Sequence, residues 1–306
     1  MIVLFTPSHS HAGVALIDPT NRRRFAFRLR TLIIIVTLIG LALFPVAAKV
    51  QKAREQKRTV AWVLANGGVV GYDWQSQESD ATSPTGPKWL RRLLGDEFFQ
   101  TVQRVNLNHT RVDDLAPLRK LTSLRQLYLW HTPVHDLSPL QGLTNLQQLH
   151  LGHTQVGPIQ FQGLTELRVL DLSGATVSDL SSLATLTKLQ ILYVSGTQVG
   201  DLSPLRRLAG LKCLRLERTH VRDLSPLSRL TKLVELRLER TQVSDLAPLK
   251  ALTELRRVYL SGTQVRDLSP LTKLSRLTSL YLYNTRVSDD QVARLQKALP
   301  KCKVRR

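Results

Sequence analysis

A leucine-rich motif recurs every 22 residues through most of this chain, and that period restricts the fold more than any other feature of the sequence. The unit reads LxxLxLxxTxVxDLSPLxxLTxL, and typical copies begin at Leu233 and Leu255. Nine copies follow Val102, with one interval, Leu151 to Leu172, shortened to 21 residues. One position of the unit marks the period throughout. It is occupied by Leu107, Leu129, Leu151, Leu172, Val194, Leu216, Leu238, Leu260 and Leu282.

Each part of the unit has a structural role that follows from its spacing. The xLxLx stretch alternates, so its apolar residues should face inward and its x residues outward, as in a half-buried strand. No unit can bury its leucine face alone, so the units should stack side by side between helical caps. We therefore expect an α/β repeat solenoid, a parallel-sheet arc of nine leucine-rich repeats.

Several copies carry a Ser-Pro pair after the strand. We interpret the serine as the N-cap and the proline as the first residue of a short helical turn. The pairs are Ser138-Pro139, Ser203-Pro204, Ser225-Pro226 and Ser269-Pro270.

The unit resembles the internalin-like class of bacterial leucine-rich repeats, which share the 22-residue period and the DLSPLxxLTxL half. The resemblance covers residues 102–289 and implies the same solenoid fold. Threonine stands where that class usually has asparagine, and we expect its hydroxyl to bond the backbone inside the turn. Ala175 interrupts this series, and we predict a local irregularity between Gly157 and Thr176. The threonines are Thr110, Thr132, Thr154, Thr197, Thr219, Thr241, Thr263 and Thr285.

The remaining segments are expected to flank the repeats. Residues 49–86 should hold a helix, a strand over 69–74 and a polar linker. Residues 87–101 should form an apolar-rich helical cap over the first rung, and the repeats should occupy 102–287. At the other end, Ser288 begins a capping box, so residues 288–306 should form a C-terminal cap and basic tail. Four motifs, the Arg-rich LRTL-type anchor, GGVVGYDW, WLRRLLGDEFF and the ALPKCKV ending, together resemble a group of single-pass bacterial repeat proteins. This resemblance implies an architecture and little about function.

Residues 31–48 form an uncharged apolar run after a basic tail, residues 1–30. Eleven of the 18 are Leu, Ile, Val or Phe, which favours membrane insertion, and the run would be about 27 Å long as a helix. We predict an uncleaved transmembrane anchor, with a signal peptide cleaved near Ala48 as the alternative. Basic residues lie on both sides of the run, so charge does not decide orientation. The export-like N-terminus favours placing the repeats on the non-cytoplasmic side.

The net charge of +20 suggests an anionic partner. The basic residues of the chain are divided among the flanks of the apolar run, the repeats and the C-terminal tail. A nucleic-acid-binding domain usually concentrates its basic residues on the one helix or face that contacts the nucleic acid. This distribution therefore argues against nucleic acid as the partner. An anionic polymer, either nucleic acid or an acidic polysaccharide, stays the alternative ligand.

The outward positions of the predicted strands carry most of the aromatic residues. Five of the six tyrosines lie there, where core packing does not require them. Tyrosine, tryptophan and arginine are enriched at binding hot spots, so we predict that a protein or peptide ligand binds the concave face. The predicted contact residues are Tyr128, Trp130, His150, Tyr193, Arg215, Arg237, Tyr259, Tyr281 and Tyr283.

Motifs for catalysis or cofactor binding are absent from the sequence. There is no phosphate-binding glycine loop, zinc motif or serine-nucleophile elbow. His109, His131 and His153 recur on successive units, but no carboxylate or cysteine recurs beside them, so we predict no metal site. Cys213 has no histidine at a neighbouring strand position, and Cys302 is too distant in a rod-like fold to form a disulfide with it. We therefore predict a membrane-tethered binding module that is not an enzyme and needs no cofactor.

Overall fold

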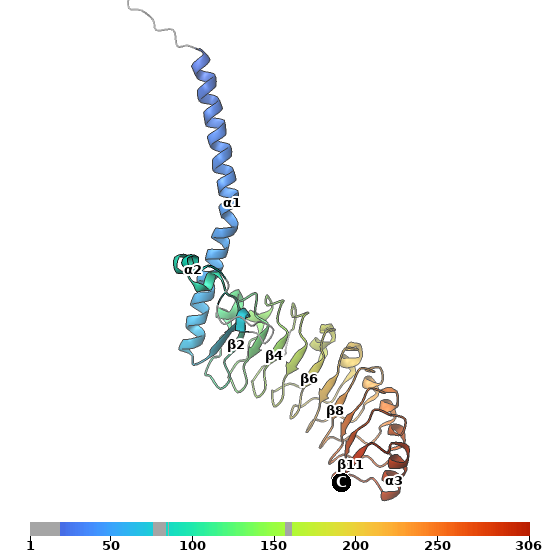
Figure 1. The fold of residues 1–306 in the computed structure, drawn as a ribbon. Helices are drawn as coiled ribbons and strands as arrows, with labels where there is room; N and C mark the ends of the chain where they lie inside the picture. Colours follow the sequence, from blue (N-terminus) through green and yellow to red (C-terminus); the bar gives the residue numbers. More distant parts are fainter. Residues whose placement is uncertain (1–18, 76–83, 85, 157–160) are drawn as a thin grey trace, which may run out of the picture. The chain divides into compact units, whose positions relative to one another are not determined.

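The computed structural model describes residues 19–75, 84, 86–156 and 161–306. The chain divides into two units, Met1–Gln51 and Lys52–Arg306. The long helix α1, Pro19–Ala65, begins in the first unit and ends in the second (Figure 1). All of the repeats lie in the second unit.

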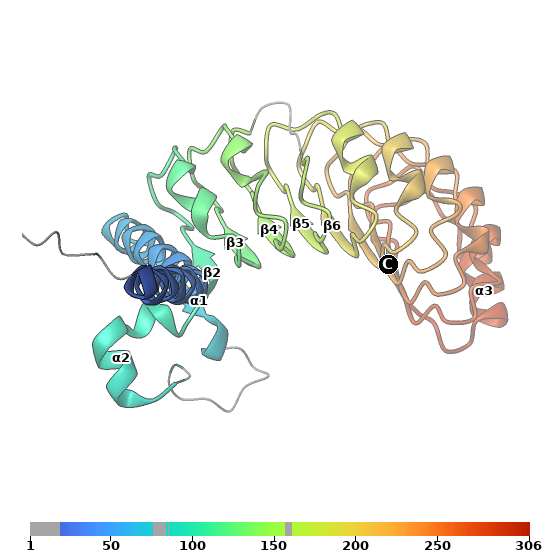
Figure 2. The same cartoon turned by 90° about the horizontal axis from the view of Figure 1, so that it is seen from above.

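An eleven-stranded sheet forms the frame of the second unit, with the strands in chain order. β1 pairs antiparallel with β2, whereas β2 to β11 pair in parallel. Figure 2 shows the strands on the inner side of an arc and the helical turns on its outer side. The predicted parallel leucine-rich-repeat solenoid is confirmed. The strands are β1 (Val69–Tyr72), β2 (Val102–Asn106), β3 (Gln126–Tyr128), β4 (Gln148–His150), β5 (Val169–Asp171), β6 (Ile191–Tyr193), β7 (Cys213–Arg215), β8 (Glu235–Arg237), β9 (Arg257–Tyr259), β10 (Ser279–Tyr281) and β11 (Lys303–Arg305).

The leucines of the unit form one continuous core along the sheet. In a central rung, Leu214 and Leu216 are fully buried. The threonine hydroxyls bond inside the turn as expected, for example from Thr219 Oγ1 to the Leu216 carbonyl at 2.7 Å. Ala175 has no hydroxyl, but its N–H still donates to the Leu172 carbonyl at 3.0 Å.

The shortened repeat leaves the strand ladder intact. β4 and β5 pair with Gln148 opposite Val169, in the same register as the other rungs. The missing residue therefore falls between the strands. Part of the predicted irregularity, residues 157–160, lies outside the described residues.

Short 3₁₀ turns form the outer side of the arc, and the interpretation of serine as their N-cap is wrong. The cap position is the preceding leucine, as at Leu202, and Ser203 is the first residue of the turn. Asp201 satisfies the backbone instead, because its Oδ1 accepts from the Ser203 N–H at 2.8 Å and its Oδ2 from the hydroxyl at 2.6 Å. The 3₁₀ turns within the described residues are Asp73–Gln75, Asp96–Phe98, Ala116–Lys120, Ser138–Leu140, Ser181–Thr185, Ser203–Arg207, Ser225–Leu227, Ala247–Ala251 and Ser269–Leu271.

The N-terminal end of the core is covered by α1 rather than by residues 87–94. Helix α2, Lys88–Leu94, has no buried residue, and Trp89 and Leu93 are 67% and 73% exposed. The last turns of α1 instead bury Val63 completely. Gln56 joins the helix to the first rung, donating to the Gln100 carbonyl at 3.0 Å and accepting from the Val102 N–H at 3.1 Å.

The C-terminal end is covered by helix α3, Asp289–Ala298, which buries Val292 and Leu295. The Ser288 hydroxyl accepts from the Gln291 N–H at its first turn. The Gln291 side chain accepts from the Leu268 N–H instead of completing a reciprocal capping box. The basic tail is not free, because its residues form β11 and extend the sheet by one strand.

One helix within the described part of the chain is long and apolar enough to cross a membrane, over Thr31–Ala65. The described side chains of residues 31–41 and 43–49 are all exposed, which agrees with an apolar run that is not part of the repeat core. A signal sequence near the N-terminus would have the same length and composition.

The cap assigned to α1 can be tested through Gln56. The substitution Gln56→Ala leaves the buried Val102 N–H without its acceptor and should lower the free energy of unfolding by about 1–3 kcal/mol. Leu64→Ala removes an exposed side chain from the same helix and should change it by less than about 0.5 kcal/mol. Urea unfolding of the two variants measures the difference. Equal losses would show that α1 does not cover the first rung.

Candidate ligand-binding face

The strands place one set of side chains in register on the concave side of the sheet. In β6 the middle residue, Leu192, is buried, whereas Ile191 and Tyr193 are partly exposed. The last residue of each strand from β2 to β11 therefore forms a column, which we call the central column. It consists of Asn106, Tyr128, His150, Asp171, Tyr193, Arg215, Arg237, Tyr259, Tyr281 and Arg305.

Side chains of the central column stack on one another. The Arg215 guanidinium lies 4.3 Å from the centre of the Tyr193 ring, and the Arg237 guanidinium lies at the same distance from Tyr259. The rings of Tyr259 and Tyr281 are stacked at 4.4 Å. Tyr128 and His150 are stacked in the same way at 4.6 Å. These contacts hold the aromatic rings in place before any ligand binds.

Arg305 completes the stack, and we did not predict this. It follows Tyr281 in the column, and its guanidinium lies 5.1 Å from the ring centre. The polar-apolar-polar alternation of Lys303, Val304 and Arg305 is a strand pattern that could have indicated it.

A second set of side chains, which we call the outer column, lies two residues beyond the central column. Trp130 and Tyr283 belong to it and are 37% and 46% exposed. Trp130 lies directly over Gly152, because a Cβ on this glycine would be 1.7 Å from the indole Nε1. Glycine is therefore needed at position 152 for the tryptophan to occupy its site. The outer column is Asn108, Trp130, Gly152, Ser173, Ser195, Glu217, Glu239, Ser261 and Tyr283.

The residue after the outer column adopts a left-handed conformation in every rung. His109, His131 and His153 have φ of 59°, 53° and 56°. This conformation directs the backbone N–H to the next rung, as from His131 to the Gly152 carbonyl at 3.0 Å. Arg218, Arg240, Asn284 or glycine occupies the equivalent position elsewhere.

The three histidine rings stack on one another. The ring centres of His109 and His131 are 5.0 Å apart, those of His131 and His153 are 4.4 Å apart, and Trp130 meets all three edge-on. Loss of solvent around the ring lowers the pKa of His131, and the charges of His153 and His109 lower it further. Within the described residues, no group of three or more His, Cys, Asp or Glu side chains could hold a metal ion.

An ion-pair network lies at the middle of the face, around Glu235. This buried carboxylate accepts hydrogen bonds from Arg237 Nε and Arg257 Nε, each at 2.7 Å. Burial alone would raise the pKa of Glu235, but these hydrogen bonds outweigh burial and lower the pKa overall. Arg215 Nη2 lies 3.8 Å from the same carboxylate. We did not predict this ion-pair network. Glu235 is the first residue of β8, two positions before the central column, and so lies outside the columns whose aromatic residues indicated a ligand face.

The outer-column glutamates differ from Glu235. Glu217 accepts from the Ser195 hydroxyl and lies 3.8 Å from Arg237 Nη1 on the next rung. Glu239 has one buried carboxylate oxygen, Oε2, without a hydrogen-bond partner in the described structure. Burial raises the pKa of Glu239, and the charge of Glu217 raises it further.

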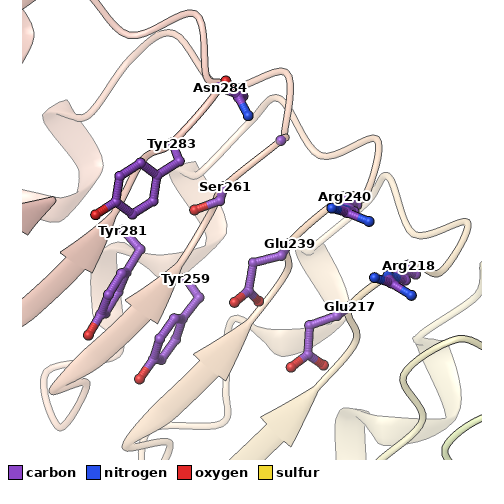
Figure 3. Close-up of a pocket in the computed structure, with 10 residues that line it drawn as sticks. Glu217, Arg218, Glu239, Arg240, Tyr259, Ser261, Tyr281, Tyr283 and Asn284 are labelled. Atoms are coloured by element: carbon purple, nitrogen blue, oxygen red, sulfur yellow. The ribbon is translucent and has the colours of Figure 1, made fainter. Parts of the chain in front are cut away.

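A hollow of about 570 Å³ opens beside these glutamates. Figure 3 shows Glu217 and Glu239 between Tyr259, Tyr281 and Tyr283 on one side and Arg218 and Arg240 on the other. Its lining residues belong to the last four rungs, so the hollow depends on the register of the sheet.

The two cysteines do not resemble nucleophiles. Burial raises the pKa of the Cys213 thiol, and it raises the pKa of Cys302 to about 11. Both thiols are therefore protonated at neutral pH, in a state that attacks poorly.

Comparison with known proteins agrees with this architecture. A family model described as Leucine Rich repeats (2 copies) matches residues 122–164, 165–207 and 253–294. The internalin inlF of Listeria monocytogenes is 32% identical over 66% of this chain, with a TM-score of 0.62. Internalin C2 of the same organism is 34% identical over 59% of this chain and 80% of its own, with a TM-score of 0.58. The chain belongs to the leucine-rich-repeat family, with repeats of the internalin type.

The similarity has clear limits. The chain covers only 59% of inlF. A leucine-rich-repeat protein of Leptospira interrogans matches 66% of this chain and 60% of its own with a TM-score of 0.58, but at 20% identity it supports the fold alone. Comparison with curated protein sequences finds no match. Scaffolds of this type are generally non-catalytic and typically bind proteins.

Glu235 and Glu239 should have opposite effects on stability, because their pKa values shift in opposite directions. The lowered pKa of Glu235 means that its ionised form stabilises the fold above the ordinary pKa of glutamate and that this is lost as pH falls through the lowered value. The raised pKa of Glu239 means that its ionised form destabilises the fold at neutral pH and that this is relieved as pH falls through the raised value.

We therefore expect Glu235→Gln to lower the thermal midpoint at pH 7 and Glu239→Gln to leave it unchanged or raise it. Thermal unfolding between pH 3 and pH 8 should show both differences shrinking toward the acidic end, and the Glu235→Gln difference should shrink only below the ordinary pKa of glutamate. A loss of stability in Glu239→Gln at pH 7 as large as that in Glu235→Gln would contradict the assignment.

Proposed function

We propose that the repeats form a non-catalytic module that binds a protein or peptide along the central column. The stack of tyrosine and arginine side chains on the concave face is the observation that supports this most strongly. The rings lie on the outward side of strands whose leucines already supply the core. Rings that are already ordered lose little conformational entropy when a ligand binds, which favours affinity.

The length of the column favours an extended ligand. Parallel strands lie about 4.8 Å apart, so nine rungs give a face roughly 40 Å long. The contact residues are those predicted from the sequence, from Tyr128 and Trp130 near one end to Tyr281 and Tyr283 near the other. The type of scaffold agrees with a protein ligand.

The charges of the face favour a protein over an anionic polymer. Arg237 and Arg257 are paired with Glu235, and Arg215 lies within 3.8 Å of it. Glu217, 3.8 Å from Arg237 Nη1, and Glu239 add two further carboxylates to the same face. The three arginines are therefore matched by three glutamates and leave little net positive charge for a polyanion. The net charge of +20 resides mainly elsewhere on the chain.

We also propose that residues 31–48 hold this module at a membrane, with the repeats on the non-cytoplasmic side. The uncharged apolar run and its exposed side chains support an anchor. With an uncleaved anchor, the full chain should stay with membranes after alkaline carbonate washing and should keep its N-terminus. A soluble form that begins at Lys49 would identify a cleaved signal sequence instead.

The ligand face can be tested by site-directed photocrosslinking in the full chain. A benzoylphenylalanine placed at Tyr193, on the concave face, should give a cross-linked adduct of defined mass in the native cells. The same residue at Lys250, exposed on an outer 3₁₀ turn, should not give it. Tyr281→Ala, which removes a ring from the same column, should reduce the adduct at least severalfold without loss of protein. The same adduct from Lys250, or none from Tyr193, would place the ligand elsewhere.

A further inference from the structure

We infer that the hollow near the C-terminal end of the concave face is a subsite for an arginine side chain of the bound protein or peptide. This inference rests on the proposed function and specifies the chemistry of one part of the ligand.

The hollow lies where one rung with small residues in both bordering columns stands between two rungs with large residues there. Along the outer column, Ser261 lies between Glu239 and Tyr283. Along the left-handed positions, Gly262 lies between Arg240 and Asn284. Figure 3 shows Ser261 set back between the glutamate and the tyrosine. The small residues therefore form the floor, and the neighbouring rungs form the walls.

The gap over Ser261 is about one side-chain layer thick. Glu239 and Tyr283 are two rungs apart, about 9–10 Å at the usual strand spacing. The adjacent central column has no gap, because Arg237, Tyr259 and Tyr281 stack there on successive rungs. A flat group inserted over Ser261 would continue the outer column in the same way.

The walls of the gap favour a cation. Glu239 forms no ion pair within 4.0 Å with the described residues, although the charges of Arg237 and Arg215 act on it, and its buried Oε2 accepts no hydrogen bond. The ring of Tyr283 is 46% exposed, and no stacked ring or guanidinium covers it in the described structure. A positive charge between them would neutralise the carboxylate and lie against an aromatic face.

Arginine fits this environment better than lysine. A guanidinium is planar, stacks on aromatic rings and donates two parallel hydrogen bonds to a carboxylate, whereas an ammonium group is compact and more strongly hydrated. The protein itself places guanidinium groups over Tyr193, Tyr259 and Tyr281. Arg218 and Arg240 also line the hollow and lie beyond the glutamates from the tyrosines in Figure 3. The Arg240 stem lies against Gly262, where a Cβ would be 3.3 Å from Arg240 Cγ.

The test measures binding of a short blocked peptide, acetyl-Gly-Arg-Gly-amide, to the full chain by ligand-observed NMR. The matched peptide carries citrulline, which has nearly the same shape but no charge, and a third carries lysine. We expect the citrulline peptide to bind at least about tenfold more weakly than the arginine peptide, with lysine in between. Equal binding of the arginine and citrulline peptides would overturn the inference.

Three variants locate the binding. Glu239→Gln removes the charge and should weaken the arginine peptide by about tenfold or more. Ser261→Phe fills the gap and should abolish binding, whereas Ser173→Phe makes the same change in the same column outside the hollow and should have no effect. Thermal midpoints show whether each variant is folded, and Glu239→Gln keeps the test valid if Ser261→Phe unfolds. Full-strength binding to Glu239→Gln would overturn the inference.

The inference and the proposed function can fail separately. A Tyr193 cross-link without arginine-peptide binding would reject the subsite and keep the concave ligand face. Arginine-peptide binding without any cross-link would keep the subsite and reject an extended ligand along the central column.

Discussion

The structure depends on the backbone hydrogen bonds that join each rung to the next. A unit cannot bury its own leucines, so each rung is stable only when its neighbours cover it. The parallel pairing keeps a constant register, as in Leu192 opposite Leu214 and Leu214 opposite Leu236. A slip of one residue would move the leucines to the solvent and the tyrosines to the core. The hydrophobic core therefore fixes the register, and the register fixes every column on the face.

The constant register brings identical positions of successive units within stacking distance. This explains why similar side chains form ladders, such as the three histidines and the Tyr259–Tyr281 pair. It also explains why one small residue matters. Gly152 makes room for Trp130, and Ser261 leaves a gap that no neighbouring side chain fills. The shape of the candidate ligand face is thus set both by its large side chains and by the positions where a small residue leaves space.

Several features could be predicted because they depend only on local spacing. The alternation in each strand identified which residues point outward, so the concave tyrosines were found correctly. The threonine hydroxyl bonds were also predictable, since donor and acceptor are three residues apart. The N-cap role was assigned wrongly to Ser203. The sequence offers both a serine and an aspartate whose side-chain oxygens could accept a hydrogen bond from the backbone at the start of the turn. Only the folded geometry shows that Asp201 accepts the bond.

The sequence by itself therefore determined the repeat and the inward and outward faces of each strand. Tertiary structure decided which segments cover the ends and which charges meet. Helix α1 rather than α2 covers the first rung because Val63 and Gln56 reach it, although both helices have apolar residues. Arg305 joins the central column only because β11 pairs with β10. Glu235 forms ion pairs with arginines while Glu239 does not, although both glutamates lie on the same rung. Such differences arise from contacts between residues distant in the chain, and a repeating sequence contains no local signal for them.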